Sequence, residues 1–276
     1  IRYPDEYGFG NGNHEWSLSP DGTCEWRGDT SSDEITGHFF GMAVYYDLCA
    51  DAGEKELIKK SLGTIAEHII NNSFKLIDRD GKPTTWAMWN PDTLNHDDRW
   101  FGERGTNSLE MLMYLKVCEH ITGDEKYTRL YSEFVSEHAF PLNTMRVKIR
   151  DAHICHIDDN LCFLSLLILL TLEKDETLRK YYLCGLEDLW SYEKIERQPF
   201  FAFIHAVFSD SDDGLSEGVR SLAEMPLDMH NYASDNENRK KLVLDTEQEP
   251  LFEPAQLKEP LPYHELNLSR PNRNVF

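Results

Sequence analysis

Apolar residues recur in the middle of the chain with the three-to-four residue spacing of helices, in successive pairs of segments. The first segments of three pairs span residues 32–51, 107–122 and 159–174, and the second segments span 54–74, 125–140 and 176–196. The letters FFAFIHAVF and GLSEGVRSLAEM indicate a fourth, shorter pair. The turns of the three long pairs align on Glu54, Glu125 and Glu176, at spacings of 71 and 51 residues. Such recurrence predicts a repeat of helical hairpins.

The two segments of each pair differ in how apolar residues are distributed around them. The first is apolar on nearly every face, as in CFLSLLILL, whereas the second has charges on one side. We expect the first helices to form an inner layer and the second an outer layer. The sequence therefore predicts an all-α fold, a complete or partial α/α toroid, in one domain spanning residues 1–276.

Two regions depart from the helical pattern. The β-prone stretches KLI and TTWAMW flank a turn signal at Asp80 and Gly81, which predicts a short β-hairpin inserted between the first two helix pairs. After Pro226 the periodicity fades, and the residues from about 227 are rich in proline, asparagine and charge. We expect them to form an irregular C-terminal tail.

Charge and hydropathy exclude several classes of partner. With 28 Lys and Arg against 49 Asp and Glu, the net charge of −21 disfavours nucleic acid, because no basic patch offsets it. The longest apolar run, Leu161–Leu172, falls short of the roughly 20 residues of a membrane span. The cluster HICHIDD is too crowded for zinc, and no nucleotide, serine-hydrolase or zincin motif occurs. We expect neither a metal nor a cofactor.

The chain begins at Ile1 with neither a methionine nor a basic and apolar leader. This favours a processed protein or a piece of a longer polypeptide, whose other domains would then be partners. We expect export to the periplasm or the outside of the cell, with a cytoplasmic location as the alternative.

Polar residues gather where the three inner helices are predicted to begin. Capping accounts for part of them, because Ser31 with Glu34, Asn107 with Glu110, and Asp158 alone fit the residue preferences of helix N-termini. Capping leaves several others unexplained, and in a toroid the starts of the inner helices converge on one mouth. These residues are Asp29, Asp33, His38, Glu103, Arg104, Asp159 and the histidines at 153 and 156.

Two carboxyl groups in one cavity, one protonated and one ionised, suit the cleavage of a glycosidic bond. The catalytic candidates are Asp33 as the acid, Asp159 or Asp158 as its partner, and Glu34. Tryptophans of the inserted hairpin would stack on sugar rings, and Arg104 would bind the carboxylate of an acidic sugar. The substrate-binding candidates are Asp29, His38, Trp86, Trp89, Glu103, Arg104, Asn107, His153 and His156.

The paired helices, together with GDTSSDEITGHFFG, LIDRDGKPTTWAMWNPDTLN and HIDDN, resemble the six-hairpin glycosidase superfamily over roughly residues 25–208. The resemblance is to bacterial members of unassigned activity. It implies an α/α toroid that acts on an oligosaccharide or polysaccharide, although about four hairpins are legible here. The first hypothesis is therefore a glycoside hydrolase.

Two further hypotheses stay open. One is a non-catalytic glycan-binding or assembly module, and the other is a sugar epimerase that uses His38, His153, His156 or His205 to move a proton. The hydrolase hypothesis carries a geometric expectation. Asp33, Arg104 and Asp159 are separated by 71 and 55 residues, nearly in phase with the hairpins, so they should share one cavity with Trp86 or Trp89 at its rim.

Overall fold

The structure is a computed structural model that describes residues 16–148, 156–194 and 197–223 of the 276-residue chain. The described part is mostly helical, with ten α-helices and two small β-hairpins, which confirms the all-α class. The predicted C-terminal tail and His153 lie outside the described residues, as does the side chain of His156. Within the described ranges no helix has both the length and the apolarity needed to cross a membrane.

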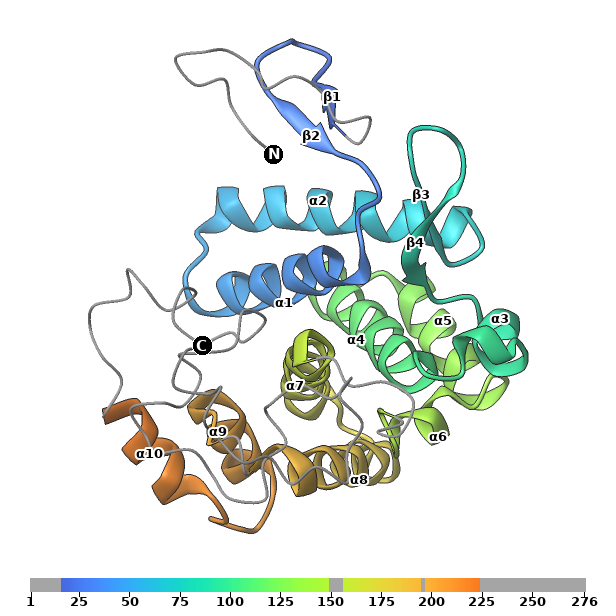
Figure 1. Ribbon diagram of the computed structural model, residues 1–276. Helices are drawn as coiled ribbons and strands as arrows, with labels where there is room; N and C mark the ends of the chain where they lie inside the picture. The colour runs from blue at the N-terminus through green and yellow to red at the C-terminus, as the bar shows by residue number, and fades with distance from the viewer. Residues whose placement is uncertain (1–15, 149–155, 195–196, 224–276) are drawn as a thin grey trace, which may run out of the picture.

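Four helix pairs follow one another along the chain (Figure 1). They are α1 (Ser32–Leu48) with α2 (Ala52–Asn71), α4 (Arg104–Thr122) with α5 (Glu125–Ser136), α7 (His156–Leu172) with α8 (Glu176–Glu193), and α9 (Pro199–Phe208) with α10 (Leu215–Ala223). Each pair was expected from the hydrophobic periodicity. The short helices α3 (Pro91–His96) and α6 (Phe140–Thr144) and the 3₁₀ turn Asp98–Trp100 were not, because such lengths show no period.

The core forms where the first helices of the pairs meet. Helices α1, α4 and α7 contact one another pairwise, and α7 lies between α1 and α4 on one side and α8 and α9 on the other (Figure 1). Helix α2 packs on α1 and α4, α5 packs on α4, and α10 packs on α9. Every residue from Gly105 to Leu115 of α4 is buried, which agrees with the expectation that first helices lie inside.

Two antiparallel hairpins project beyond α2 (Figure 1). The pairing of β3 (Lys75–Ile77) with β4 (Pro83–Met88) confirms the predicted insertion, and Gly81 at φ +80° occupies its turn. The other hairpin pairs β1 (Trp16–Leu18) with β2 (Glu25–Arg27), and strands of three residues are too short to show alternation. The backbone N–H and hydroxyl of Thr85 donate to Asp29 at 2.7 and 2.8 Å. These bonds fasten the chain before α1 to β4.

The helix caps confirm one prediction and correct two. Ser31 and Glu34 form the predicted capping box of α1. Helix α4, however, begins at Arg104 after an N-cap that makes no side-chain hydrogen bond, so Asn107 and Glu110 lie inside the helix and do not cap it. Helix α7 begins at His156, so Asp158 is a first-turn residue. Tertiary partners, described below, explain why polar residues occur within these helices.

Candidate active site

A cavity of about 210 Å³ opens beside the N-terminal ends of α1 and α7, next to β4 and the start of α4. We call it the helix-end cavity. Five of its lining residues, from four separate segments, were predicted as site residues from the sequence. The lining consists of Ser31, Ser32, Asp33, Trp86, Glu103, Asn107, Ile157 and Asp158.

Asp33 and Asp158 bring two carboxyl groups from α1 and α7 to the wall of this cavity. Burial raises the pKa of Asp33, and the negative charges of Asp158 and Glu34 raise it further. A like charge nearby disfavours the ionised form of a carboxyl group. The surroundings of Asp33 therefore favour its protonated form more than water does.

Glu110 is a third carboxyl group, and it lies behind the cavity rather than in its lining. It is fully buried on α4, where its carboxyl oxygens accept hydrogen bonds from Trp89 Nε1 at 2.9 Å and from Thr36 Oγ1 at 3.1 Å. Burial raises the pKa of Glu110 to about 8, and the charges of Asp158 and Asp33 contribute in the same direction. Glu110 is therefore largely protonated at neutral pH.

A chain of hydroxyl groups connects Glu110 to the cavity wall. Thr36 Oγ1 lies 2.6 Å from the hydroxyl of Tyr114, and that hydroxyl donates to the backbone oxygen of Ser32 at 3.4 Å. Ser32 itself lines the helix-end cavity. Sequence reasoning explained Glu110 as a cap and overlooked this network. The available signal was an acidic residue within the otherwise apolar stretch LEMLMYL.

The two predicted tryptophans of the hairpin have different roles. Trp86 lines the helix-end cavity and has 54% of its surface exposed, so its ring is available to a ligand. Trp89 is fully buried, and its ring packs edge-on against Tyr114. Its indole N–H donates a hydrogen bond to Glu110. Asn107 is 2% exposed, and its amide donates to the backbone oxygen of Met88 at 2.9 Å. This bond fixes β4, and with it Trp86, against α4.

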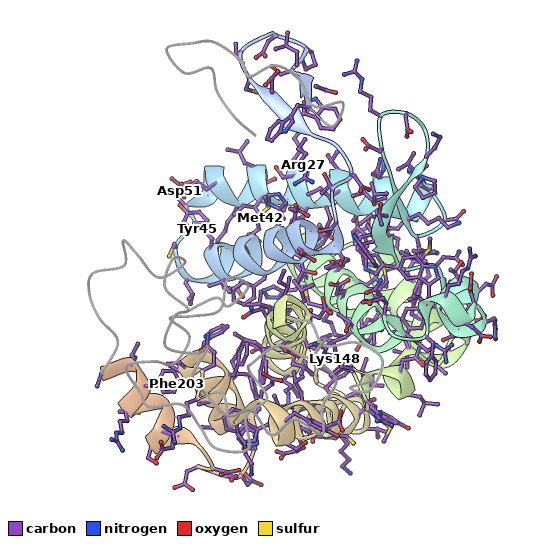
Figure 2. The ribbon with its side chains drawn as sticks, viewed as in Figure 1. Arg27, Met42, Tyr45, Asp51, Lys148 and Phe203 are labelled. Carbon is purple, nitrogen blue, oxygen red and sulfur yellow. The ribbon has the colours of Figure 1, made fainter. Side chains whose placement is uncertain are left out.

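Arg104 and Asp159 are not among the residues that line the cavity, so the in-phase trio is not brought together. Asp159 is 1% exposed and forms an ion pair of 2.8 Å with the buried Lys148, which Figure 2 shows beside α7. Arg104 Nε donates to the backbone oxygen of Leu94 at 2.6 Å, and its guanidinium lies over the ring of Phe101. Both side chains therefore serve tertiary packing.

Asp29, Glu34 and His38 are not among the described residues of the lining either. Glu34 accepts hydrogen bonds from Ser31 as part of the capping box, and Asp29 is bound to Thr85. His38 is exposed on α1. The described lining holds no histidine, lysine or arginine. His205, an epimerase candidate, is buried, stacks on Trp190 and contacts Glu187.

The described residues contain no group of three or more His, Cys, Asp or Glu side chains suited to a metal ion. Comparison with protein-family models, with curated proteins and with solved structures finds no match for this chain. The chemistry of the site is therefore argued from its own geometry.

Proposed function

We propose that this protein is a carbohydrate-active enzyme, a glycoside hydrolase that acts at the helix-end cavity. The observation that carries the proposal is that Asp33 and Asp158, two carboxyl groups from separate helices, line one cavity together with the exposed Trp86. Glycoside hydrolysis needs two carboxyl groups in different protonation states. Burial and the neighbouring carboxylates raise the pKa of Asp33, which favours the protonated form that a general acid requires.

In this proposal Asp33 is the general acid and Asp158 is its partner. Asp33 gives its proton to the glycosidic oxygen as the bond to the anomeric carbon breaks. A water molecule then adds its oxygen to the anomeric carbon and returns one proton to the Asp33 carboxylate. The carboxylate of Asp158 stabilises the positive charge that develops on the sugar. Trp86 would stack on the C–H face of the ring.

The lining also favours a class of sugar. Asp33, Glu103 and Asp158 are acidic, and no basic side chain is among the described lining residues. A uronic acid would be repelled, so we propose a neutral oligosaccharide or polysaccharide as the substrate. A volume of about 210 Å³ is below the usual range of ligand sites, which indicates that about one sugar ring is enclosed.

The arrangement of the helices supports the proposal. Helix pairs whose first members meet in the core agree with a partial α/α toroid, which we propose as the architecture. In that arrangement the helix-end cavity would correspond to the mouth where inner helices begin. The proposed enzyme class is thus that of the six-hairpin glycosidase superfamily, which the sequence resembles.

The test is hydrolysis of a panel of neutral oligosaccharides and polysaccharides, followed by reducing-sugar release. We expect Asp33→Asn and Asp158→Asn each to lower turnover by about 10² to 10⁴-fold, the usual contribution of general acid–base groups. Asp92→Asn, an exposed carboxyl group on α3, is the matched control and should keep full activity. Full activity in both site variants would refute the proposal. Sugar binding by the wild type with no turnover on any substrate would favour the glycan-binding alternative.

A further inference from the structure

Two larger cavities are lined by the two hairpins and the segment that precedes α1, and one of them extends to α2. One encloses about 400 Å³ and is lined by residues of both hairpins, including Ser17 and Asp80. The other encloses about 420 Å³ and extends between β3, α2 and the start of α1. We call them the hairpin cavities. They adjoin each other, because Trp26, Asp78 and Arg79 line both.

The three shared residues combine an aromatic ring, a hydrogen-bond acceptor and a donor. Asp78 is held in place by the backbone N–H groups of Asp29 and Arg79, each at 2.6 Å from one of its oxygens. Gly28 permits this approach, since a Cβ there would lie 2.7 Å from Asp78 Oδ2. A carboxylate accepts about four hydrogen bonds, so this fixed group can accept more. The exposed Arg79 guanidinium has no hydrogen-bond or ion-pair partner in the described part of the chain.

The second hairpin cavity adds an apolar wall with polar groups set into it. Ile65 of α2 and Leu76 of β3 supply apolar surface. His68 Nε2 accepts from the backbone N–H of Ile77 at 3.1 Å, which leaves Nδ1 as the ring nitrogen that can donate. Thr84 is 6% exposed, and its hydroxyl has no hydrogen-bond partner among the described residues. Buried polar groups normally have a hydrogen-bond partner, so this hydroxyl is an unusual polar position within the cavity wall.

We propose that the hairpin cavities bind one or two neutral pyranose units of a glycan, as a saccharide site separate from the helix-end cavity. A pyranose presents a C–H face to an aromatic ring, here Trp26, and carries hydroxyl groups that donate to Asp78 and accept from Arg79. Volumes near 400 Å³ fall within the range of small-ligand sites. Asp29, Asp78 and Asp80 around one cavity disfavour anionic ligands.

This inference rests on the proposed function only for the class of ligand, because none of its residues lines the helix-end cavity. If both sites bind the same glycan, the hairpin cavities would hold a part of the polymer remote from the cleaved bond. The substrate would then be an extended glycan rather than a short oligosaccharide.

The test is affinity electrophoresis in gels containing soluble xylan, galactomannan, β-glucan or hydroxyethylcellulose, with the Asp33→Asn variant used to prevent turnover. We expect at least one polysaccharide to retard it, and we expect Arg79→Ala or Trp26→Phe added to Asp33→Asn to raise the dissociation constant at least five-fold. Arg99→Ala, which removes an exposed arginine paired with Asp97 on the 3₁₀ turn, is the matched control and should change nothing. Circular dichroism spectra establish that each variant is folded.

The outcomes separate this inference from the proposed function. Hydrolysis that depends on Asp33, together with retardation that Arg79→Ala and Trp26→Phe leave unchanged, would overturn the saccharide site and leave the hydrolase standing. Retardation that depends on Arg79 without hydrolysis of any substrate would do the reverse. If no polysaccharide retards the protein, the saccharide site is wrong.

Discussion

At the scale of single residues, Glu110 is the group whose environment most changes its chemistry. It is fully buried, and its hydrogen-bond partners Trp89 and Thr36 come from two other elements. Its pKa of about 8 in the folded protein lies above its usual value of 4.5. The folded state therefore holds a proton that the unfolded chain releases between those two values, and the free energy of unfolding must fall as pH rises through that interval.

We expect Glu110→Gln to remove this pH dependence. A glutamine side chain can still accept from Trp89, but it does not ionise. The free energy of unfolding of the wild type should fall relative to the variant between pH 5 and 8, by up to about 1.4 kcal/mol per pH unit. Urea denaturation at several pH values measures this. Glu125→Gln, which alters an exposed carboxylate on α5, should follow the wild type, and parallel curves for Glu110→Gln and the wild type would contradict the buried, protonated state.

The residue scale also shows what sequence can and cannot predict about a site. The capping box of Ser31 and Glu34 was predictable because its partners are three residues apart. The partners of Asn107 and Asp159 were not, because Met88 and Lys148 come from other parts of the fold. Asp158 and Asp159 illustrate the difficulty, since neighbours on a helix point about 100° apart. One lines the helix-end cavity and the other is buried in an ion pair.

At the scale of elements, glycines mark where helices approach other parts of the backbone closely. A Cβ on Gly185 of α8 would collide with the backbone oxygen of Thr144 at the end of α6. A Cβ on Gly105 of α4 would collide with the backbone oxygens of Arg146 and Val147. Gly63 of α2, in contrast, has nothing within 4 Å of such a Cβ. The same residue type is therefore required in one helix and costly in another.

We expect Gly185→Ala to lower the free energy of unfolding by about 1–3 kcal/mol, because the carbonyl groups it meets cannot rotate away as a side chain would. Gly63→Ala should raise it by roughly 0.5–1 kcal/mol through the better helix propensity of alanine. Chemical denaturation of the two variants beside the wild type measures both effects. Equal shifts of the same sign would show that α6 and α8 do not pack as closely as described.

Helices and strands were predictable from the sequence where they are long enough for apolar residues to recur at a regular spacing. The eight paired helices span enough turns for their apolar residues to recur, and Asp80 with Gly81 marked the turn of the second hairpin. The first hairpin has strands of three residues, and α6 has five residues. Packing by neighbouring elements, rather than an internal pattern, holds such short elements in place.

At the scale of the whole molecule, the net charge of −21 opposes the compact state. The expectation that Asp33, Arg104 and Asp159 share one cavity, because they are spaced nearly like the hairpins, also belongs to this scale. It assumed that equivalent positions in successive hairpins point to one mouth, and α4 begins at Arg104 rather than at the predicted residue 107. The phase of each helix about its own axis depends on its neighbours, so spacing along the chain predicted the pairs but not the directions of these side chains.

We expect salt to stabilise the protein by screening this repulsion. Raising NaCl from about 10 to 150 mM shortens the Debye length from about 30 to 8 Å. A gain of about 1 kcal/mol would raise the unfolding midpoint by about 2–4 °C in a chain of this size. Thermal unfolding followed by circular dichroism measures the midpoint, with an osmotically matched sucrose series as the control. A midpoint that falls with salt would mean that exposed ion pairs such as Lys194 with Asp213, which salt screens, outweigh the net repulsion.

The hydrogen bond of 2.9 Å between Trp89 and Glu110 has a consequence for how the molecule can be observed. The indole is fully buried, and a negative charge appears beside its N–H whenever Glu110 ionises. A charge that close to an indole shifts its absorption and emission. The absorption and emission wavelengths of Trp89 would therefore report the protonation state of a carboxyl group that solvent does not reach.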